Sequence, residues 1–299
     1  MNIALVTGSA GFIGGHLTDS LLKSEYMVVG LDNMTKGLKT TMDSHIKHKN
    51  FVPAFYDITS KNTEEIFSKY RPKYVFHLAA RPGVTPSVED PVGSDLINVN
   101  GTVNMLSLSL KYGVSRFIFS SSSSVYGGSD GSPNSETDLP NPKSPYALQK
   151  LVGEKYCKLF SKEMGLDTVS LRYFNVIGER QRADSAYAAV LPAFATCKGK
   201  NISPTIFGDG LQSRDFCPVS SVVSANILNG EAVNVARGEG TSLLQLCEIL
   251  DLKSPIFKEE RQGDVKHSLA NIEKIKSILG YMPIDNLEKE ILRTSYYYK

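Results

Sequence analysis

The amino-terminal residues place a short apolar run directly before a glycine-rich turn and a helical pattern. Residues 1–7 read Met-Asn-Ile-Ala-Leu-Val-Thr, glycines follow at Gly8, Gly11 and Gly14, and the helical pattern runs from Gly15 to Lys23. In a strand–turn–helix unit, such glycines permit a tight turn, close approach of the backbone to a pyrophosphate and close packing of helix on sheet. The helix amino terminus then faces the phosphates. The sequence therefore predicts a dinucleotide-binding fold.

The next apolar run indicates which dinucleotide is bound. Residues 26–31 have a β-strand pattern that ends at Asp32, 18 residues after Gly14. A carboxylate at that place accepts hydrogen bonds from the adenosine ribose hydroxyls and repels a 2′-phosphate. We therefore expect NAD rather than NADP; the alternative is that Asp32 is only a turn residue before Asn33.

Strand-like and helical segments then alternate through the first half of the chain. Strands are predicted over 51–55, 73–78, 116–120 and 168–174, with a helix over 96–112. This order is typical of an α/β, Rossmann-like doubly wound parallel sheet, whose ligands lie at the carboxyl ends of the strands. We expect residues 1–176 to form the NAD-binding domain, with 212–236 returning to it. Residues 177–211 and 237–299 would form a smaller C-terminal substrate-binding lobe.

A serine, a tyrosine and a lysine indicate a reaction class. Tyr146 and Lys150 are four residues apart, so on one helix face the ammonium can favour ionisation of the phenol, whose ordinary pKa is about 10. Ser122 lies in the serine run 120–124, directly after a predicted strand. A Tyr-x-x-x-Lys spacing also occurs on ordinary amphipathic helices, and a serine run can be low-complexity sequence. After a dinucleotide-binding start, however, the three residues indicate catalysis of a hydride transfer.

Composition excludes several other classes of protein. The net charge of +2 gives no overall case for nucleic-acid binding, and the basic stretch 36–49 is better interpreted as a solvated loop. The four cysteines have neither zinc-ligand nor disulfide spacing, so we expect reduced thiols and no bound metal. No apolar run approaches the roughly 20 residues of a membrane span, and a strand beginning at residue 2 leaves no room for a signal peptide. We expect a cytoplasmic protein that binds neither nucleic acid nor membrane.

Together the motifs resemble the extended short-chain dehydrogenase/reductase superfamily, specifically the UDP-sugar 4-epimerases, over nearly the whole chain. The motifs that carry the resemblance are residues 7–14, 32–33, 57–58, 77–80, 98–102, 120–127, 146–150, 171–176, 213–216 and 261–264. The resemblance implies catalytic roles for Ser122, Tyr146 and Lys150. It implies cofactor contacts for Gly8, Gly11, Phe12, Ile13, Gly14, Asp32, Asn33, Asp57, Ile58, Leu78, Ala79, Ala80, Asn98, Ser120, Tyr146, Lys150 and Tyr173. His77 corresponds to a structural residue at the end of a buried strand.

The serine loop separates related chemistries within that superfamily. Sugar 4,6-dehydratases carry an Asp-Glu pair before the Val-Tyr-Gly, and UDP-glucuronate decarboxylases carry a glutamate, whereas this chain has Ser123-Ser124. The loop also lacks the cysteine of GDP-sugar epimerase/reductases. Without an acid in the loop, elimination has no obvious proton donor or base. The resemblance thus implies that Tyr146 removes the 4-hydroxyl proton while NAD accepts hydride from C4. The keto sugar then turns over and takes the hydride back on its other face.

The second half of the chain supplies the implied substrate contacts. By their place in the family motifs these are Ser122, Ser123, Tyr146, Asn175, Ala189, Val190, Phe207, Arg214, Arg261, Asp264 and Ser268. The two arginines suit a diphosphate, because guanidinium binds phosphate bidentately. In the family, a small residue four beyond the ribose-binding acid admits an N-acetyl group, and here that residue is Ser268. We therefore expect UDP-GlcNAc/UDP-GalNAc interconversion, with plain hexoses or uronic acids as further candidates.

One motif departs from the family, and other functions stay open. After residues 214–216 the family continues with an aromatic, a valine and acids, whereas this chain reads Cys217-Pro218-Val219-Ser220-Ser221, which leaves open how the lobes are joined. The alternatives are a nucleotide-sugar dehydratase or oxidoreductase, and a non-enzymatic NAD-binding protein, since fold does not fix function. Relatives pair the helices that correspond to 96–112 and 147–162 into a four-helix interface, which implies a homodimer.

Overall fold

The structure is a computed structural model that describes residues 2–181, 190–227, 233–260, 265–283 and 286–298. Its main feature is a sheet of seven parallel strands in the order β11-β6-β5-β4-β1-β2-β3. The strands are β1 (Ile3–Thr7), β2 (Met27–Leu31), β3 (Phe51–Ala54), β4 (Tyr74–His77), β5 (Arg116–Ser122), β6 (Thr168–Tyr173) and β11 (Val233–Val235). The order reverses direction between β1 and β4, so the predicted doubly wound parallel sheet is confirmed.

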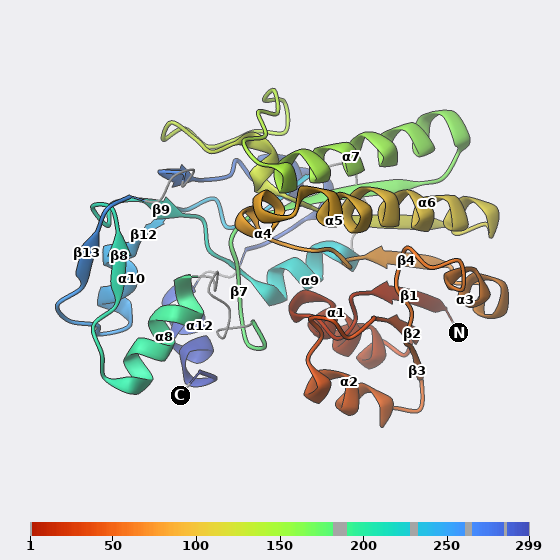
Figure 1. Ribbon diagram of the computed structural model, residues 1–299, viewed down its shortest axis with the longest axis horizontal. Coiled ribbons are helices and arrows are strands. Elements are labelled where there is room, and N and C mark those ends of the chain that lie inside the picture. Colours follow the sequence, from red (N-terminus) through yellow and green to blue (C-terminus); the bar gives the residue numbers. More distant parts are fainter. Residues whose placement is uncertain (1, 182–189, 228–232, 261–264, 284–285, 299) are drawn as a thin grey trace.

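Helices cover both faces of this sheet (Figure 1). One layer contains α1 (Phe12–Lys23), α2 (Lys39–Ile46) and α9 (Val219–Ile227). The other contains α3 (Thr63–Tyr70), α4 (Val84–Glu89), α5 (Pro91–Asp95), α6 (Thr102–Lys111) and α7 (Pro145–Met164). Each helix layer packs against one face of the sheet and forms an apolar core with it. One core lies around Leu17, Val28 and Val222, and the other around Phe117, Met105 and Phe160. Two buried faces explain why the strands are nearly continuous apolar runs.

Two short non-α segments flank the catalytic candidates. The predicted helix 96–112 begins with a π-helical segment, η1 (Leu96–Gly101), and only then continues as α6. A π-turn inserts an extra residue into the helix, and such turns are frequent at functional sites. After β5 a single 3₁₀ turn, η2 (Ser123–Tyr126), ends at Gly127, whose φ is +75°. The serine run therefore comprises the end of β5 and the start of a tight turn. This agrees with its interpretation as a site loop rather than low-complexity sequence.

A smaller lobe lies beside the sheet, on the left in Figure 1. Its strands are β7 (Val176–Ile177), β8 (Thr205–Phe207), β9 (Ser213–Arg214), β10 (Cys217–Pro218), β12 (Thr241–Ser242), β13 (Ile256–Lys258) and β14 (His267–Ser268). They form the sheets β12-β9-β14, β13-β8 and β10-β7. Its helices are α8 (Val190–Lys200), α10 (Leu243–Ile249) and α12 (Leu287–Tyr296), whereas α11 (Glu273–Leu279) packs on β11 of the large sheet. A third core, around Phe194, Ile206 and Leu246, holds α8, β8 and α10 together.

The segment that departs from the family motif forms regular structure. Cys217 and Pro218 make the short strand β10, which pairs with β7, and α9 begins at the next residue. Cys217 is fully buried, and α9 packs on α1 of the cofactor-binding unit. Apolar packing thus joins this segment to the sheet domain.

Within the described ranges, the helices are all too short or too polar to cross a membrane.

Candidate active site

The helix that carries Tyr146 and Lys150 has strong signals at both ends. Ser144 precedes α7 and its hydroxyl accepts the Ala147 N–H at 3.2 Å, while Pro145 occupies the first turn. Gly165 ends the helix with φ +80°. A second serine, Ser87 of α4, accepts the backbone N–H of Tyr146 at 3.0 Å. These contacts fix where the helix begins, and therefore where the tyrosine lies.

The three predicted catalytic residues lie together at the carboxyl end of β5. Ser122 hydrogen-bonds to Tyr146. The Lys150 ammonium donates to the Ser120 carbonyl at 2.8 Å and lies 5.8 Å from the centroid of the Tyr146 ring. The helical spacing thus places both side chains against the serine strand. A hydroxyl, a phenol and an ammonium side by side are the groups needed to move a proton to or from a substrate hydroxyl.

Burial dominates the acid–base properties of this group in the protein alone. It raises the pKa of Tyr146 to about 12, and the hydrogen bond from Ser122 opposes this only in part. It also lowers the pKa of Lys150 to about 8. The expectation that Lys150 makes the phenol ionise near neutral pH is therefore wrong for the protein alone, because both groups lose hydration. A further positive charge at the site is needed to favour the phenolate.

The glycine turn has the close contacts that dinucleotide binding requires. Gly8 has φ +71°, and a Cβ on it would lie 3.0 Å from the Ala79 nitrogen. A Cβ on Gly14 would lie 2.1 Å from the Gly8 carbonyl oxygen, so a side chain there would separate helix from turn. Beside the turn, the buried Asp32 carboxylate accepts the Ala10 N–H at 2.9 Å and the Met34 N–H at 2.8 Å. These features fit a bound NAD, with Gly11, Phe12 and Ile13 at the start of α1.

The predicted cofactor residues that follow β2 and β3 are also close together. Asn33 donates to the Asp57 carboxylate at 2.7 Å. Burial raises the pKa of Asp57, but hydrogen bonds from Thr59 and Asn33 outweigh it and hold the pKa below its ordinary value. Ile58 is buried under η1, where a Cβ on Gly101 would meet it at 2.5 Å. The hydrogen bond between Asn33 and Asp57 thus connects the segments that follow β2 and β3, at the carboxyl edge of the sheet.

His77 holds the backbone of the predicted cofactor-lining residues in place. The Thr7 hydroxyl accepts the N–H groups of Leu78 at 3.1 Å and Ala79 at 3.0 Å, so its own proton points to His77 Nδ1, 2.9 Å away. His77 Nε2 then carries the proton and donates to Thr102 at 3.1 Å. Burial lowers the pKa of His77 to about 3, which keeps the ring neutral. The structural role expected for His77 agrees with these contacts.

Asn98 connects the neighbouring loop to the catalytic helix. Its amide exchanges hydrogen bonds with the backbone of Arg81, which follows Ala79 and Ala80, at 2.8 and 3.0 Å. It also donates to Gln149 of α7 at 2.8 Å. Tyr173, at the end of β6, is 7% exposed and donates to Asn226 at 2.9 Å. Both residues are in the predicted region, but they contact protein groups here, and their cofactor contacts stay predictions.

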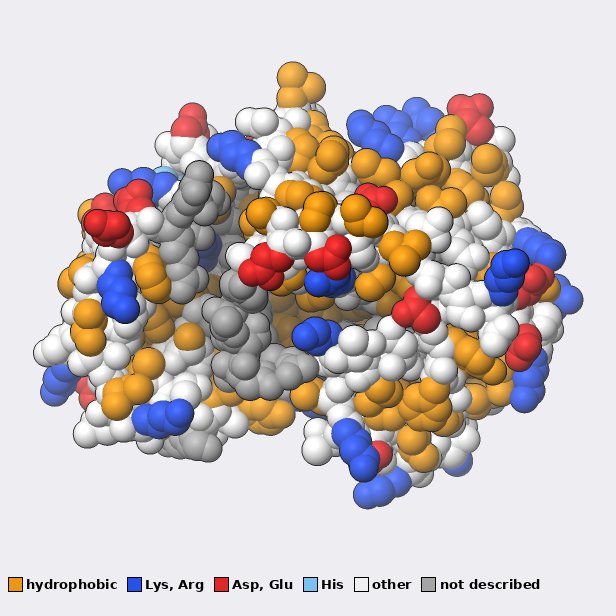
Figure 2. Space-filling model, viewed as in Figure 1, with side chains coloured by type: hydrophobic (Ala, Val, Ile, Leu, Met, Phe, Trp, Pro, Cys, Tyr) orange, Lys and Arg blue, Asp and Glu red, His pale blue; other side chains and the backbone are white. Residues whose placement is uncertain are grey.

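Several predicted substrate residues come together between the lobes. Asn175 donates to the Ser268 hydroxyl at 3.2 Å, and Ser268 pairs in register with Arg214 where β14 meets β9. Ser123 begins η2, Val190 begins α8, and Phe207 ends β8. Ala189, Arg261 and Asp264 lie outside the described residues. Figure 2 shows the surface hollowed between the sheet domain and the smaller lobe.

Several residues that support the site were missed by the sequence analysis. Glu154 of α7 accepts the Ser121 hydroxyl at 2.5 Å and forms a buried ion pair with Arg172 of β6 at 2.7 Å. Glu154 lies two helical turns after Tyr146, so the periodicity could have identified it. Ser87 lies 59 residues before Tyr146, and no local pattern connects the two.

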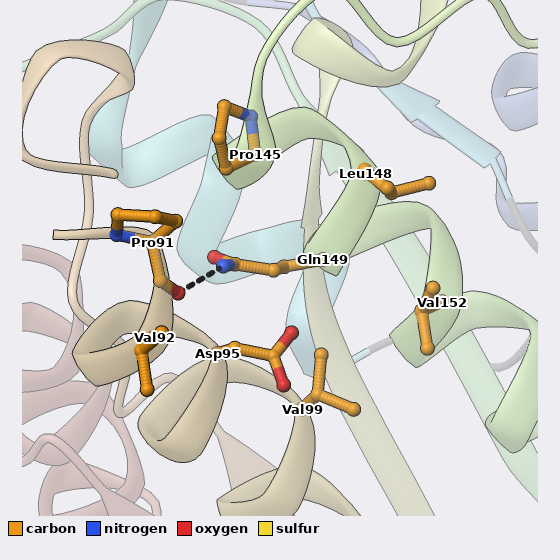
Figure 3. Close-up of a pocket in the computed structure, with 8 residues that line it drawn as sticks. All are labelled: Pro91, Val92, Asp95, Val99, Pro145, Leu148, Gln149 and Val152. Atoms are coloured by element: carbon orange, nitrogen blue, oxygen red, sulfur yellow. Dashed lines mark hydrogen bonds between the residues drawn. The ribbon is translucent and has the colours of Figure 1, made fainter. Parts of the chain in front are cut away.

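A groove on the outer side of the helix layer is separate from this site (Figure 3). It is lined by Pro91, Val92, Asp95, Val99, Pro145, Leu148, Gln149 and Val152. Apolar residues that are at least 45% exposed surround it on α4, α5, η1 and α7, namely Val84, Val88, Val92, Leu96, Leu148 and Leu159. We call these six residues the outer apolar face; Figure 2 shows hydrophobic side chains gathered over these helices.

Comparison with known proteins places this geometry in a family. Residues 4–240 match the NAD dependent epimerase/dehydratase family. The chain is 40% identical to a "Putative UDP-glucose 4-epimerase" of Methanocaldococcus jannaschii, over 97% of this chain and 96% of that protein. Among solved structures, it is similar to the UDP-N-acetylglucosamine 4-epimerase of Methanobrevibacter ruminantium in complex with UDP-N-acetylmuramic acid (TM-score 0.93, 35% identity). It is also similar to the UDP-glucose 4-epimerase of Thermotoga maritima with UDP-glucose (TM-score 0.93, 37% identity). Each structural match covers 99% of this chain and 98% of the other.

Proposed function

Because the chain belongs to the NAD-dependent epimerase/dehydratase family and is a UDP-sugar 4-epimerase, an isomerase, we propose that its favoured substrates are UDP-GlcNAc and UDP-GalNAc. The observation that carries this choice is Ser268, a small side chain in β14 that contacts Asn175. A small residue there leaves room for an N-acetyl group on C2. The M. ruminantium relative is named for UDP-N-acetylglucosamine, which agrees with the proposal.

In the proposed mechanism, the side chains that meet at the carboxyl end of β5 transfer the proton of the sugar hydroxyl. Tyr146 takes the proton from the 4-hydroxyl of the sugar, and Ser122, hydrogen-bonded to Tyr146, holds the same oxygen. When bound, NAD supplies the hydride acceptor and a cationic ring whose charge favours the phenolate. Lys150, held by the Ser120 carbonyl, adds a second positive charge. Because the hydride is returned, no net NADH is produced.

The proposed binding site for the UDP-sugar includes residues of the smaller lobe. Arg214 on β9, together with Arg261, would bind the diphosphate, and Asp264 would bind the uridine ribose. Asn175 would contact the diphosphate, Ala189, Val190 and Phe207 would line the uridine pocket, and Ser123 would contact the sugar. In this proposal residues 1–176 and 212–236 form the cofactor-binding domain, and residues 177–211 and 237–299 the substrate lobe. β9, at the start of 212–236, pairs with β12 and β14 of that lobe, so Arg214 lies where the two units meet. The pairing of β11 with β6 supports the return of the chain to the large sheet.

We also propose that the protein is a homodimer. The outer apolar face exposes 80% of Val92 and 52% of Leu148, on helices that belong to the layer over the sheet. Contiguous exposed apolar side chains of this kind mark interaction surfaces. The groove in Figure 3 would receive side chains of the second copy. The partner would cover the helices predicted for the interface, which are η1 with α6, and α7, together with the adjoining α5. For location, the four cysteines are free, which supports a reducing compartment such as the cytoplasm.

The function is tested by incubating the protein with UDP-GlcNAc and, separately, with UDP-Glc, without added reductant. Inversion at C4 is followed by NMR and NADH by its absorbance. We expect inversion of UDP-GlcNAc at the higher rate, no net NADH, and loss of inversion in Tyr146→Phe. Steady NADH release or a 4-keto-6-deoxy product without inversion would move the protein to the oxidoreductases or dehydratases.

The role of Ser268 is tested by enlarging it. We expect Ser268→Tyr to lower kcat/KM for UDP-GlcNAc by at least about tenfold relative to UDP-Glc, since a steric clash in a pocket changes selectivity by about 1–3 kcal/mol. Ser268→Ala, which removes only the hydroxyl that Asn175 contacts, should keep the wild-type preference. An unchanged ratio in the tyrosine variant would show that another residue determines the substrate.

A further inference from the structure

Three successive turns of α7 bind three successive residues at the end of β5. The Tyr146 side chain hydrogen-bonds to Ser122, Lys150 to the Ser120 carbonyl at 2.8 Å, and Glu154 to the Ser121 hydroxyl at 2.5 Å. The helix residues are spaced by four, so they lie on one face. Within β5, the Ser121 side chain points to the sheet face that α7 covers, whereas Ser120 contacts α7 through its carbonyl oxygen.

The contact between Glu154 and Ser121 is buried and has a fixed geometry. Ser121 is 2% and Glu154 8% exposed. Arg172 holds the Glu154 carboxylate with two nitrogens, Nε at 2.9 Å and Nη2 at 2.7 Å. Burial lowers the pKa of Arg172, but the hydrogen bonds and charge of Glu154 outweigh it and raise the pKa above its ordinary value. A carboxylate gripped by both of its oxygens has little freedom, so the Ser121 hydroxyl meets a rigid acceptor.

The same arginine also fixes the far end of the serine turn. Arg172 Nη1 donates to the Tyr126 hydroxyl at 2.8 Å, and that hydroxyl donates to Asn234 of β11 at 2.7 Å. Ser122 lies between the two anchored positions, Ser121 directly before it and Tyr126 at the end of η2. The Glu154–Arg172 pair therefore constrains the backbone on both sides of the hydroxyl that contacts Tyr146.

We propose that Glu154 is a positioning residue of the epimerase reaction, which acts through Ser121 to hold the Ser122 hydroxyl against Tyr146. This inference rests on the proposed role of Ser122 and Tyr146. A buried ion pair contributes little net stability compared with apolar residues of similar size, so what this pair supplies is geometry. A misplacement of about 1 Å at a reacting group can cost on the order of a hundredfold in rate.

The test removes the hydrogen bond between Ser121 and Glu154 and keeps the ion pair between Glu154 and Arg172. Replacing Glu154 would leave the buried Arg172 charge without an anionic partner, which is expected to destabilise the protein strongly. Ser121→Ala removes one hydroxyl and leaves both Arg172–Glu154 contacts. We expect kcat to fall on the order of tenfold, less than the roughly 10²–10⁴-fold that a general acid–base group contributes, because Ser122 and Tyr146 are both retained. KM for the UDP-sugar and the bound NAD should stay unchanged. Ser109→Ala is the matched control, because its buried hydroxyl donates to the Met105 carbonyl at 2.7 Å on α6, away from the site.

A double-mutant cycle separates positioning from general structural support. If Ser121 acts through Ser122, Ser121→Ala should have no further effect on kcat in the Ser122→Ala background. Equal effects of Ser121→Ala in both backgrounds, or a wild-type kcat in Ser121→Ala, would overturn the proposal. If the wild type inverts no UDP-sugar, the proposed function fails by itself. Crystal structures then decide the inference: separation of the Ser122 and Tyr146 hydroxyls in Ser121→Ala supports it, and an unchanged contact overturns it.

Discussion

At the scale of single residues, burial sets the properties of the catalytic candidates. The tyrosine and lysine that spacing brings together are both removed from water, and each is thereby shifted toward its neutral form. In the cofactor-free protein, the buried positive charge of Lys150 therefore lowers the free energy of unfolding. Bound oxidised NAD would add a positive charge that favours the ionised form of Tyr146.

The buried charge of Lys150 predicts a pH dependence of stability. The pKa of Lys150 is lowered from 10.5 to about 8 by burial. Below pH 8 the folded and unfolded chains both hold the proton. Between about pH 8 and 10.5 the unfolded chain holds it more often, so the free energy of unfolding rises with pH. We expect the cofactor-free wild type to gain up to about 3 kcal/mol relative to Lys150→Met over this range.

Chemical denaturation of both proteins between pH 7.5 and 10.5 measures the difference. Lys155→Met, an exposed lysine on the same helix, should track the wild type at every pH. A constant difference between wild type and Lys150→Met would show that Lys150 is not shifted.

At the scale of elements, the register of α7 depends on a contact with α4. Ser87 is fully buried, accepts the Tyr146 N–H and donates its own proton to the Val84 carbonyl at 2.6 Å. We expect Ser87→Ala to cost about 2 kcal/mol in the free energy of unfolding, because a buried N–H loses its acceptor. It should also lower kcat, since the first turn of the helix carries Tyr146. Urea unfolding and the NMR assay measure the two effects.

The matched control for that helix start is Ser68→Ala. Its exposed hydroxyl donates to the Glu65 carbonyl on α3. We expect a change in stability below about 0.5 kcal/mol and full activity. Equal losses in the two variants would contradict a specific role for Ser87.

The sequence predicted the long elements of the fold and the short-range part of the site. Strand–helix alternation is regular over the first half of the chain, so the parallel sheet followed from it, and the four-residue spacing brought Tyr146 to Lys150. The small lobe could not be predicted in the same way, because strands of two residues such as β9 and β14 have no periodicity. Contacts between distant segments, such as Ser87 with Tyr146, have no local pattern. The pKa of Tyr146 was predicted in the wrong direction, because burial is a tertiary property.

At the scale of the whole molecule, the outer apolar face predicts a dimer that one charge can dissociate. An aspartate at position 92 would be solvated in a monomer, because Val92 is 80% exposed, but buried in the proposed interface. We expect wild type to have twice the chain mass of 32.8 kDa by light scattering, and Val92→Asp to have the mass of one chain. Met282→Asp, at an 81% exposed residue outside the outer apolar face, should stay dimeric. A monomeric wild type would refute the proposed interface.

The division between the long sheet and the short strands has a consequence for how such enzymes diversify. Ser122, Tyr146 and Lys150 lie on a central strand and a 20-residue helix, whereas Ser268 and Arg214 lie on two-residue strands at the edge of the smaller lobe. If Ser268 selects the sugar as we propose, a substitution in β14 can alter the preferred sugar and leave intact the strand and the helix that hold Ser122, Tyr146 and Lys150.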